Sequence, residues 1–210
     1  FRKVIEQAGK FHADLFLIAG DLFHRQPLVK DLKKVNALFS MIPDTKIVLI
    51  AGNHDYLRKD SPYRKFKWGK NVRGLWNQNI SHVDFPELGV RISGCSYGSR
   101  EITRPVYDSL KKSGEMPVEI LLAHGGDEKH IPISKERLAA SGFDYIALGH
   151  IHKPQILIKD RMIYAGALEP IDKNDIGPHG FIKGEIRNGR VQTAFVSSAL
   201  REYKNAEIIV

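Results

Sequence analysis

Apolar runs alternate with amphipathic stretches through the first 150 residues of the chain. Four runs, at residues 15–19, 46–51, 119–123 and 145–148, are short and apolar, which is typical of strands. Between them, apolar residues recur at helical spacing and predict helices at 1–11, 28–42, 103–114 and 135–141. Strands and helices therefore alternate along this part of the chain.

The pattern changes after residue 150. Residues 155–158 and 162–165 predict one hairpin, and residues 181–187 and 191–196 predict a second, with the turn signal Asn188-Gly189 between its strands. A last strand is expected at 207–210. Strand–helix alternation followed by paired strands predicts an α/β fold with mixed sheets, and we expect residues 1–210 to form a single domain.

Composition narrows the possible classes of protein. With 42% hydrophobic and 27% charged residues, the chain can build a core and is not of the disordered type. No apolar run is long enough to cross a membrane, and the single cysteine, Cys95, excludes an internal disulfide framework and suits a reducing cytoplasm. The net charge of +8 favours a polyanionic partner such as DNA.

Metal-binding residue types follow each of the four predicted strands. Functional groups of open α/β sheets gather beyond the carboxyl ends of the strands, so these side chains are expected to share one crevice. Taken singly, a histidine after a strand or a Gly-Asp pair is more often a surface or turn feature. The prediction rests on four successive strand ends, which supply Asp21 and His24, then Asn53, His54 and Asp55, then His124, then His150 and His152.

Histidine and aspartate together favour Mn²⁺, Fe²⁺ or Zn²⁺ over Ca²⁺ or Mg²⁺. An Asp21 carboxylate can bridge two ions, and in an extended segment His150 and His152 project to one side, where they can serve two neighbouring ions. Two such ions would clamp a phosphate and activate a water for attack. His54, with Asn53 before it and Asp55 after it, suits a histidine that contacts the phosphate without binding metal.

These motifs resemble the signature of calcineurin-like metallophosphoesterases, and the resemblance extends over essentially the whole chain. The matching segments are Gly-Asp-Leu-Phe-His at 20–24, Gly-Asn-His-Asp at 52–55, His-Gly at 124–125 and Gly-His-Ile-His at 149–152. Protein phosphatases of this class have a second aspartate, followed by Arg-Gly, where this chain has His24 and Arg25-Gln26. In that respect the chain is most similar to DNA-repair exonucleases of the SbcD and YhaO type.

The resemblance implies a fold, an activity and a set of roles. The fold would be a four-layer αββα sandwich of two mixed sheets flanked by helices. The activity would be that of a Mn²⁺-dependent DNA exonuclease in double-strand-break repair, working as a homodimer with a coiled-coil ATPase partner of the SbcC type. Asp21 would bridge two divalent ions, Asn53, His124 and His150 would complete the second ion, and His152 would bind the first. His54 would contact the scissile phosphate and could also protonate the leaving oxygen, with Asp55 positioning it, and His24 would lie beside the site and help to orient the substrate or His54.

One departure from the family pattern concerns the first ion. The family begins with an Asp-x-His motif that supplies two of its ligands, and no such motif precedes Asp21 here. We expect the chain to be an internal piece of a longer protein, with that motif before Phe1 and a DNA-binding cap after Val210. The first-ion site would then be incomplete in this chain, and the chain by itself could be inactive.

Basic residues alternate with aromatic ones between Tyr56 and Trp76. Arg58, Arg64, Lys65 and Lys67 could follow a nucleic-acid backbone while the aromatic rings stack on bases, or the segment could be a solvated connection that its aromatics anchor. His12, His82 and His130 are expected to be surface residues. His179 lies in a predicted turn, and Cys95 is expected in the core.

Two other functions are compatible with the sequence. One is a phosphodiesterase acting on nucleotides or small phosphoesters, against which the basic charge and the Phe23-His24 pair argue. The other is a non-catalytic DNA-binding or scaffolding module with a degenerate metal site. Substrate competition separates the first from a nuclease, and the presence of the Asp-x-His motif in the parent gene separates the second.

Overall fold

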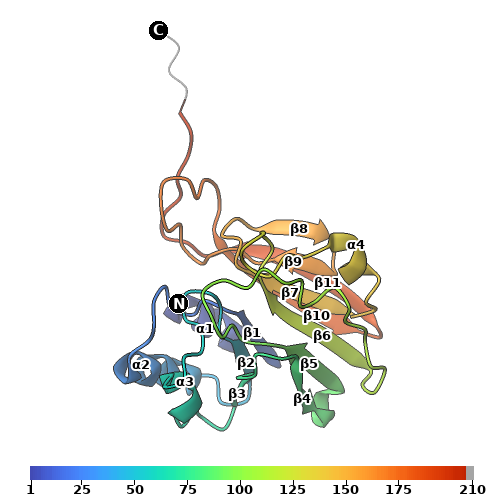
Figure 1. Cartoon of the computed structure of the whole chain (residues 1–210). Helices are drawn as coiled ribbons and strands as arrows, with labels where there is room; N and C mark the ends of the chain where they lie inside the picture. Colours follow the sequence, from blue (N-terminus) through green and yellow to red (C-terminus); the bar gives the residue numbers. More distant parts are fainter. Residues whose placement is uncertain (207–210) are drawn as a thin grey trace.

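The computed structural model describes residues 1–206 as helices packed on three β-sheets (Figure 1). The predicted strand at 207–210 lies outside this range. The elements are, in chain order, α1 (Arg2–Lys10), β1 (Leu15–Ala19), α2 (Val29–Phe39), β2 (Lys46–Ile50), α3 (Pro62–Lys65), β3 (Val72–Gly74), β4 (Ser81–Phe85), the 3₁₀ helix η1 (Pro86–Leu88), β5 (Val90–Gly94), β6 (Val118–His124), α4 (Lys135–Ala139), β7 (Tyr145–Gly149), β8 (Gln155–Ile158), β9 (Met162–Tyr164), β10 (Gly180–Arg187) and β11 (Arg190–Ser197).

The predicted α/β fold is confirmed, with several sheets flanked by helices. Strands β1, β2 and β3 form a parallel sheet, and β10 and β11 form the predicted hairpin as a sheet of their own. The largest sheet has the order β4-β5-β6-β7-β9-β8, parallel in its centre and antiparallel at both edges, where β4 pairs with β5 and β8 with β9. This six-stranded sheet is mixed, as predicted, whereas the three-stranded sheet is parallel throughout.

The two larger sheets pack face to face because their strands are apolar on both sides. Along β2, Ile47 and Leu49 face the core beneath α1 and α2, whereas Val48 and Ile50 belong to the cluster between the sheets. Alternate residues of a strand point to opposite faces, so one continuous apolar run serves both layers. Ile120 and Leu122 of β6 meet the β2 residues from the other sheet.

The far face of the six-stranded sheet carries the fourth layer. Leu121 and Ala123 of β6 pack there against Leu138 of α4 and the fully buried ring of Tyr107. The molecule thus has the order helix, sheet, sheet and an outer layer that combines α4 with irregular backbone.

The predicted helix at 103–114 is wrong. The segment consists of turns and irregular chain, with one isolated bridge between Ile102 and His130. Pro105 lacks an amide hydrogen and restricts the residue before it to extended backbone, which opposes a helix there. The Tyr107 hydroxyl is drawn into the core, where it accepts a hydrogen bond from the His124 amide at 3.2 Å.

The sequence pattern did not predict β3, β4 and β5. These strands contain polar residues, which interrupt the apolar pattern that predicts a strand. Arg91, for example, lies within β5 and is nevertheless buried, because its guanidinium forms ion pairs with Asp84 and Glu115. An arginine neutralised on two sides fits a strand that its charge would otherwise exclude.

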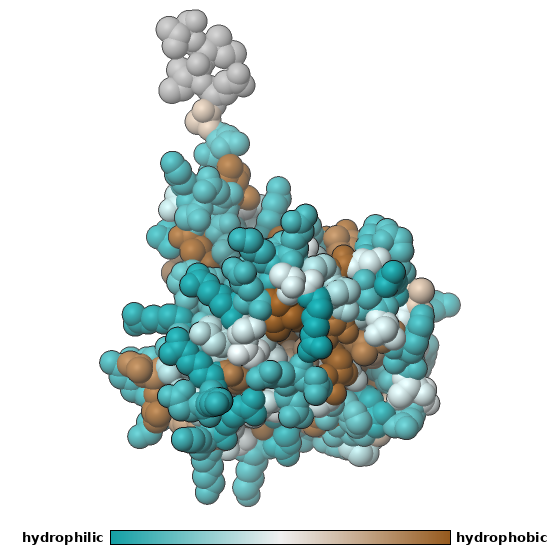
Figure 2. Space-filling model, viewed as in Figure 1, coloured by the Kyte–Doolittle hydropathy of each residue, from teal (hydrophilic) through white to brown (hydrophobic). Residues whose placement is uncertain are grey.

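The outer surface is mostly polar. Figure 2 shows hydrophilic side chains over most of the face seen there, with hydrophobic surface visible between them near the middle. Among residues 1–206, no helix is long and apolar enough to span a membrane.

Candidate metal centre

The ends of β1, β2, β6 and β7 meet at one place, and two glycines allow it. Gly20 has φ of +85°, and a Cβ there would overlap the ring of His124; a Cβ on Gly52 would overlap the carboxylate of Asp21. Any side chain at either position would push the strand ends apart. The glycines that the sequence places after β1 and β2 therefore let residues from two sheets come together.

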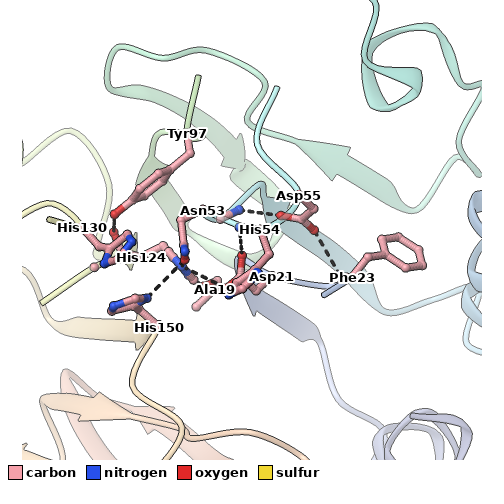
Figure 3. A network of polar contacts seen from close by, with 12 residues as sticks. Ala19, Asp21, Phe23, Asn53, His54, Asp55, Tyr97, His124, His130 and His150 are labelled. Atoms are coloured by element: carbon pink, nitrogen blue, oxygen red, sulfur yellow. Dashed lines mark hydrogen bonds and ion pairs between the residues drawn. The ribbon is translucent and has the colours of Figure 1, made fainter. Parts of the chain in front are cut away.

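Four predicted ligands converge where these strands end (Figure 3). The Nε2 atom of His124 lies 2.8 Å from Oδ1 of Asn53 and 3.4 Å from Oδ2 of Asp21. The Nδ1 atom of His150 lies 3.2 Å from the same Asn53 oxygen. Ligand atoms of Asp21, His124 and His150 are all within 4.8 Å of one another, close enough to hold one metal ion.

The donor set fits a divalent cation. Nδ1 of His124 lies 2.7 Å from the carbonyl oxygen of Ala19, and since a carbonyl only accepts, that nitrogen carries the proton. In a neutral ring Nε2 then presents a lone pair to the oxygens of Asn53 and Asp21. Lone pairs directed at one another are stabilised by a positive charge between them, which a divalent metal ion would supply. Nitrogen and oxygen donors in this combination suit Mn²⁺, Fe²⁺ or Zn²⁺.

Two of the candidate ligands have an unusual backbone. Asp21 has φ of +50° and His150 has φ of +96°. Residues other than glycine rarely adopt positive φ, and such conformations are retained where the surrounding structure enforces them, often at functional sites. The strain at both positions is consistent with side chains held for binding.

The charge state of Asp21 follows from its neighbours. Burial alone would raise the pKa of the Asp21 carboxyl, but the hydrogen bond and charge of His124 and the amide of His54 together outweigh burial and lower that pKa. The His54 amide donates to Oδ1 of Asp21 at 2.9 Å. Asp21 is therefore an ionised carboxylate at neutral pH, the form that binds cations.

His54 stands beside this cluster and not within it. Its ring stacks on the ring of His24, with centroids 4.5 Å apart and planes inclined by 25°. Burial lowers the pKa of His54, Asp21 raises it, and the charge of His24 lowers it again, so the net shift is downward. His54 also lines an open cavity of about 610 Å³ together with Asn53, His150 and His152. The prediction that His24 lies next to His54 agrees with this geometry, and their catalytic roles remain predictions.

Asp55 was expected to orient the ring of His54, and its contacts are different. Its carboxylate accepts hydrogen bonds from the Gly52 amide at 2.7 Å, the Phe23 amide at 3.2 Å and the Tyr63 hydroxyl at 2.6 Å. Within the described part of the chain, no hydrogen bond joins Asp55 to the His54 ring. Burial raises the pKa of Asp55 to about 6, against the hydrogen bond from Tyr63. Asp55 thus ties the loop after β1 to the loop after β2.

His152 lines the same cavity, but among the described residues it is not one of the donors that converge on one point. Its Nδ1 atom is 3.3 Å from Oδ2 of Asp175, in the segment between β9 and β10. His179 of the predicted turn is buried, and its ring contacts the carbonyl oxygens of Ala167 and Asp175 at 3.1 and 3.2 Å. His179 therefore supports the segment that carries Asp175.

Sequence reasoning missed Asp127 and treated His130 as a surface residue. Oδ2 of Asp127 lies 2.7 Å from Nε2 of His150, and Nδ1 of His130 lies 2.9 Å from the same carboxylate. Both residues belong to the turn that follows β6. An acidic residue in a turn carries no local sign of such a partner, and only the proximity to His124-Gly125 could have drawn attention to it.

The basic and aromatic segment divides into two kinds of side chain. The rings of Tyr63, Trp68 and Trp76 pack on one another, and Trp68 also packs on Phe39, against the core beneath the helices. Tyr63 is buried and the two tryptophans are partly buried, which favours the anchoring alternative for these aromatics. The four basic residues that were proposed to contact nucleic acid, Arg58, Arg64, Lys65 and Lys67, are exposed.

Comparison with known proteins agrees with this geometry. The family model described as calcineurin-like phosphoesterase matches residues 1–154. The uncharacterized metallophosphoesterase YhaO of Bacillus subtilis is 28% identical, over 92% of this chain and 50% of that protein. The DNA double-strand break repair protein Mre11 of Methanocaldococcus jannaschii is 29% identical over 83% of this chain and 50% of that protein, and Mre11 of Archaeoglobus fulgidus is 27% identical over 99% and 55%. The chain spans about half the length of these curated relatives.

Proposed function

The chain belongs to the calcineurin-like phosphoesterase family of metal-dependent hydrolases, and we propose that it forms the catalytic core of a Mn²⁺-dependent phosphodiesterase that cleaves DNA. The observation that carries the proposal is the convergence of Asp21, Asn53, His124 and His150 beside His54. The resemblance of the motifs to DNA-repair exonucleases, and the similarity to two proteins named for double-strand break repair, support DNA as the substrate.

Each side chain would have a distinct task. Asp21, Asn53, His124 and His150 would hold one divalent ion, and Asp21 and His152 would serve a second ion. Bound divalent ions would neutralise the phosphate and make water a better nucleophile at neutral pH. His54 is not one of the converging donors, and its N–H would donate to a phosphate oxygen or to the leaving oxygen.

The charges around the cavity support a polyanionic substrate over a small one. Arg100, Lys129 and Lys153 are exposed and line the cavity together with His54, and they outnumber its two carboxylates, Glu101 and Asp175. Among the ion pairs formed within residues 1–206, none involves these three cations. A small phosphodiester offers one phosphate to such a cavity, whereas a nucleic-acid strand offers several.

The substrate class can be tested by competition. The protein, expressed with its native flanking sequence and loaded with Mn²⁺, would hydrolyse bis(p-nitrophenyl) phosphate while unlabelled DNA oligonucleotide or thymidine monophosphate is added. The proposal predicts that the oligonucleotide inhibits at a far lower phosphate concentration than the nucleotide does. Equal inhibition per phosphate would favour a phosphodiesterase for small substrates instead.

We extend the proposal to assembly, on the family resemblance. The protein would act as a homodimer and associate with a coiled-coil ATPase of the SbcC type. A monomeric mass in solution would count against the dimer, and failure to bind such an ATPase would count against the partner.

A further inference from the structure

The side of His150 that faces away from the candidate metal centre is occupied by a carboxylate. Nε2 of His150 lies 2.7 Å from Oδ2 of Asp127, while Nδ1 lies 3.2 Å from the Asn53 oxygen on the opposite side of the ring. The two ring nitrogens therefore face two different environments. The distance to Asp127 is the shorter one and is typical of a charge-assisted hydrogen bond.

The contact with Asp127 decides where the proton of His150 lies. An ionised carboxylate can only accept hydrogen bonds, so the proton is on Nε2. With its proton on Nε2, the neutral ring presents a lone pair at Nδ1, on the side of the Asn53 oxygen. That lone pair points to the place where Asp21, Asn53 and His124 also converge.

The Asp127 carboxylate is itself held by several donors. Its Oδ1 atom accepts hydrogen bonds from the amides of Lys129 and His130 at 2.8 and 2.9 Å, and the Nδ1 atom of His130 lies 2.9 Å from each carboxylate oxygen. The turn is closed by a hydrogen bond that the Gly126 amide donates to the His130 carbonyl at 2.8 Å. Asp127 is thus placed before any ligand arrives.

We propose that Asp127, held by His130, is a positioning residue that fixes the tautomer of His150 so that Nδ1 faces the metal ion. The inference rests on the proposed metal centre and adds a residue that acts through His150 without touching the ion. A carboxylate on the far nitrogen also makes the ligating nitrogen a stronger donor.

The same residues could also bind a metal ion in a second way, which requires the opposite tautomer of His150. Ligand atoms of Asp127, His130 and His150 lie within 4.8 Å of one another and could hold an ion by themselves. His150 would then bind through Nε2, which would have to lose its proton, and Nδ1 would become the protonated nitrogen. The two arrangements therefore require opposite tautomers of His150, which makes them distinguishable.

The decisive experiment reads the tautomer directly. Ring ¹⁵N chemical shifts of His150, assigned with a His150→Gln variant, would be recorded for the metal-free protein and during titration with diamagnetic Zn²⁺. The proposal predicts a protonated Nε2 throughout and a Zn²⁺-dependent shift at Nδ1. A bare Nε2, or a Zn²⁺-dependent shift at Nε2, would overturn it. Neither readout depends on hydrolysis, so the outcome is independent of the substrate proposed above.

Metal affinity provides the second readout, with a matched control in the next residue. Asp127→Asn should weaken Mn²⁺ binding, measured by calorimetry, by about 10- to 100-fold. Glu128→Gln removes the same charge from an exposed neighbour and should bind Mn²⁺ like the wild type. Asp127→Ser can still accept hydrogen bonds from the turn amides but offers no carboxylate, so it should lose affinity as Asp127→Asn does. Wild-type affinity in Asp127→Ser would show that Asp127 only shapes the turn.

Discussion

The imidazole rings of His24 and His54 are stacked, with centroids 4.5 Å apart. His24 is exposed, whereas His54 lines the cavity beside the candidate ligands, so the outer ring limits the rotation of the inner one. A ring that must reach a phosphate oxygen benefits from such restriction, since small displacements of reacting groups are costly.

Replacement of His24 by alanine should therefore affect turnover and leave metal binding intact. We expect kcat for DNA hydrolysis to fall by about 10- to 100-fold, because the His54 ring loses its neighbour. Mn²⁺ affinity, measured by calorimetry, should not change. His82→Ala, at an exposed histidine of β4, is the matched control and should behave like the wild type. Loss of Mn²⁺ binding in His24→Ala would show that His24 acts on the metal centre instead.

The buried hydrogen bond between Tyr63 and Asp55 should contribute to stability. The hydroxyl donates to the carboxylate at 2.6 Å, and both side chains are almost fully buried. Tyr63→Phe leaves a buried carboxylate with one donor fewer, which should lower the free energy of unfolding by about 1 to 3 kcal/mol. Urea denaturation measures the change. The control is Tyr56→Phe, which removes a hydroxyl that is not part of the Tyr63–Asp55 hydrogen bond. An equal loss of unfolding free energy in Tyr56→Phe would contradict a stabilising role for that hydrogen bond.

Acid should destabilise the fold partly through Glu119. Burial would raise its pKa, but hydrogen bonds from the Ser113 amide and hydroxyl and from the Gly114 amide outweigh burial and hold that pKa below its ordinary value of 4.5. A lowered pKa in the folded state means that the stabilisation is present above pH 4.5 and is lost as pH falls through the folded-state pKa.

The corresponding variant is Glu119→Gln, compared with Glu6→Gln on the exposed face of α1. At pH 7 we expect Glu119→Gln to lower the free energy of unfolding by about 1 to 3 kcal/mol, since hydrogen bonds to a charged group are lost. The difference from the wild type should shrink as pH falls below 4.5, because the wild type then loses the same bonds. A difference that stays constant from pH 7 to pH 3 would contradict this account of Glu119.

Substitution of the three cavity cations should weaken DNA binding in a salt-dependent manner. For single-stranded DNA, the slope of log K against log salt concentration becomes shallower by about 0.7 for every phosphate that the protein no longer neutralises. We therefore expect a triple Arg100, Lys129 and Lys153 to alanine variant to show a shallower slope and a higher KM for oligonucleotide. A triple alanine variant of Lys30, Lys33 and Lys34, exposed on α2, removes the same charge elsewhere. Equal slopes for the two variants would mean that net charge, and not the cavity, attracts DNA.

The parts of the fold that could be predicted from sequence are those where the local pattern of apolar and polar residues is enough to determine the secondary structure. The runs that became β1, β2, β6 and β7 are apolar on both faces, and the segments of β8 to β11 alternate with a clear turn between β10 and β11. The missed strand β5 depends on Arg91, whose burial requires partners from β4 and from the segment before β6. Such a strand is defined by contacts between distant residues, which the local pattern does not contain.

In the candidate metal centre too, some residues could be predicted from the local sequence pattern, whereas others depend on contacts between distant residues. Asp21, Asn53, His124 and His150 stand at or just beyond the carboxyl ends of strands, so the order of elements was enough to predict that they converge. Asp127 reaches His150 across 23 residues and resembles any acidic turn residue in the sequence. Asp55 was assigned to His54 because the two are adjacent in the chain, yet its partners come from the loop after β1 and from α3. Adjacency in sequence predicted the location of that carboxylate and not its partner.

The most direct test of the central claim is Mn²⁺-dependent hydrolysis of a labelled DNA oligonucleotide by the protein with its native flanking sequence, beside its His54→Ala variant. The account predicts cleavage that a chelator abolishes and that Mn²⁺ restores. In His54→Ala the rate should fall by about 10²- to 10⁴-fold while bound Mn²⁺ is retained, since His54 is outside the ligand set. Cleavage that persists in the presence of chelator or at an unchanged rate in His54→Ala, or a Mn²⁺-loaded wild type that leaves DNA intact, would contradict it.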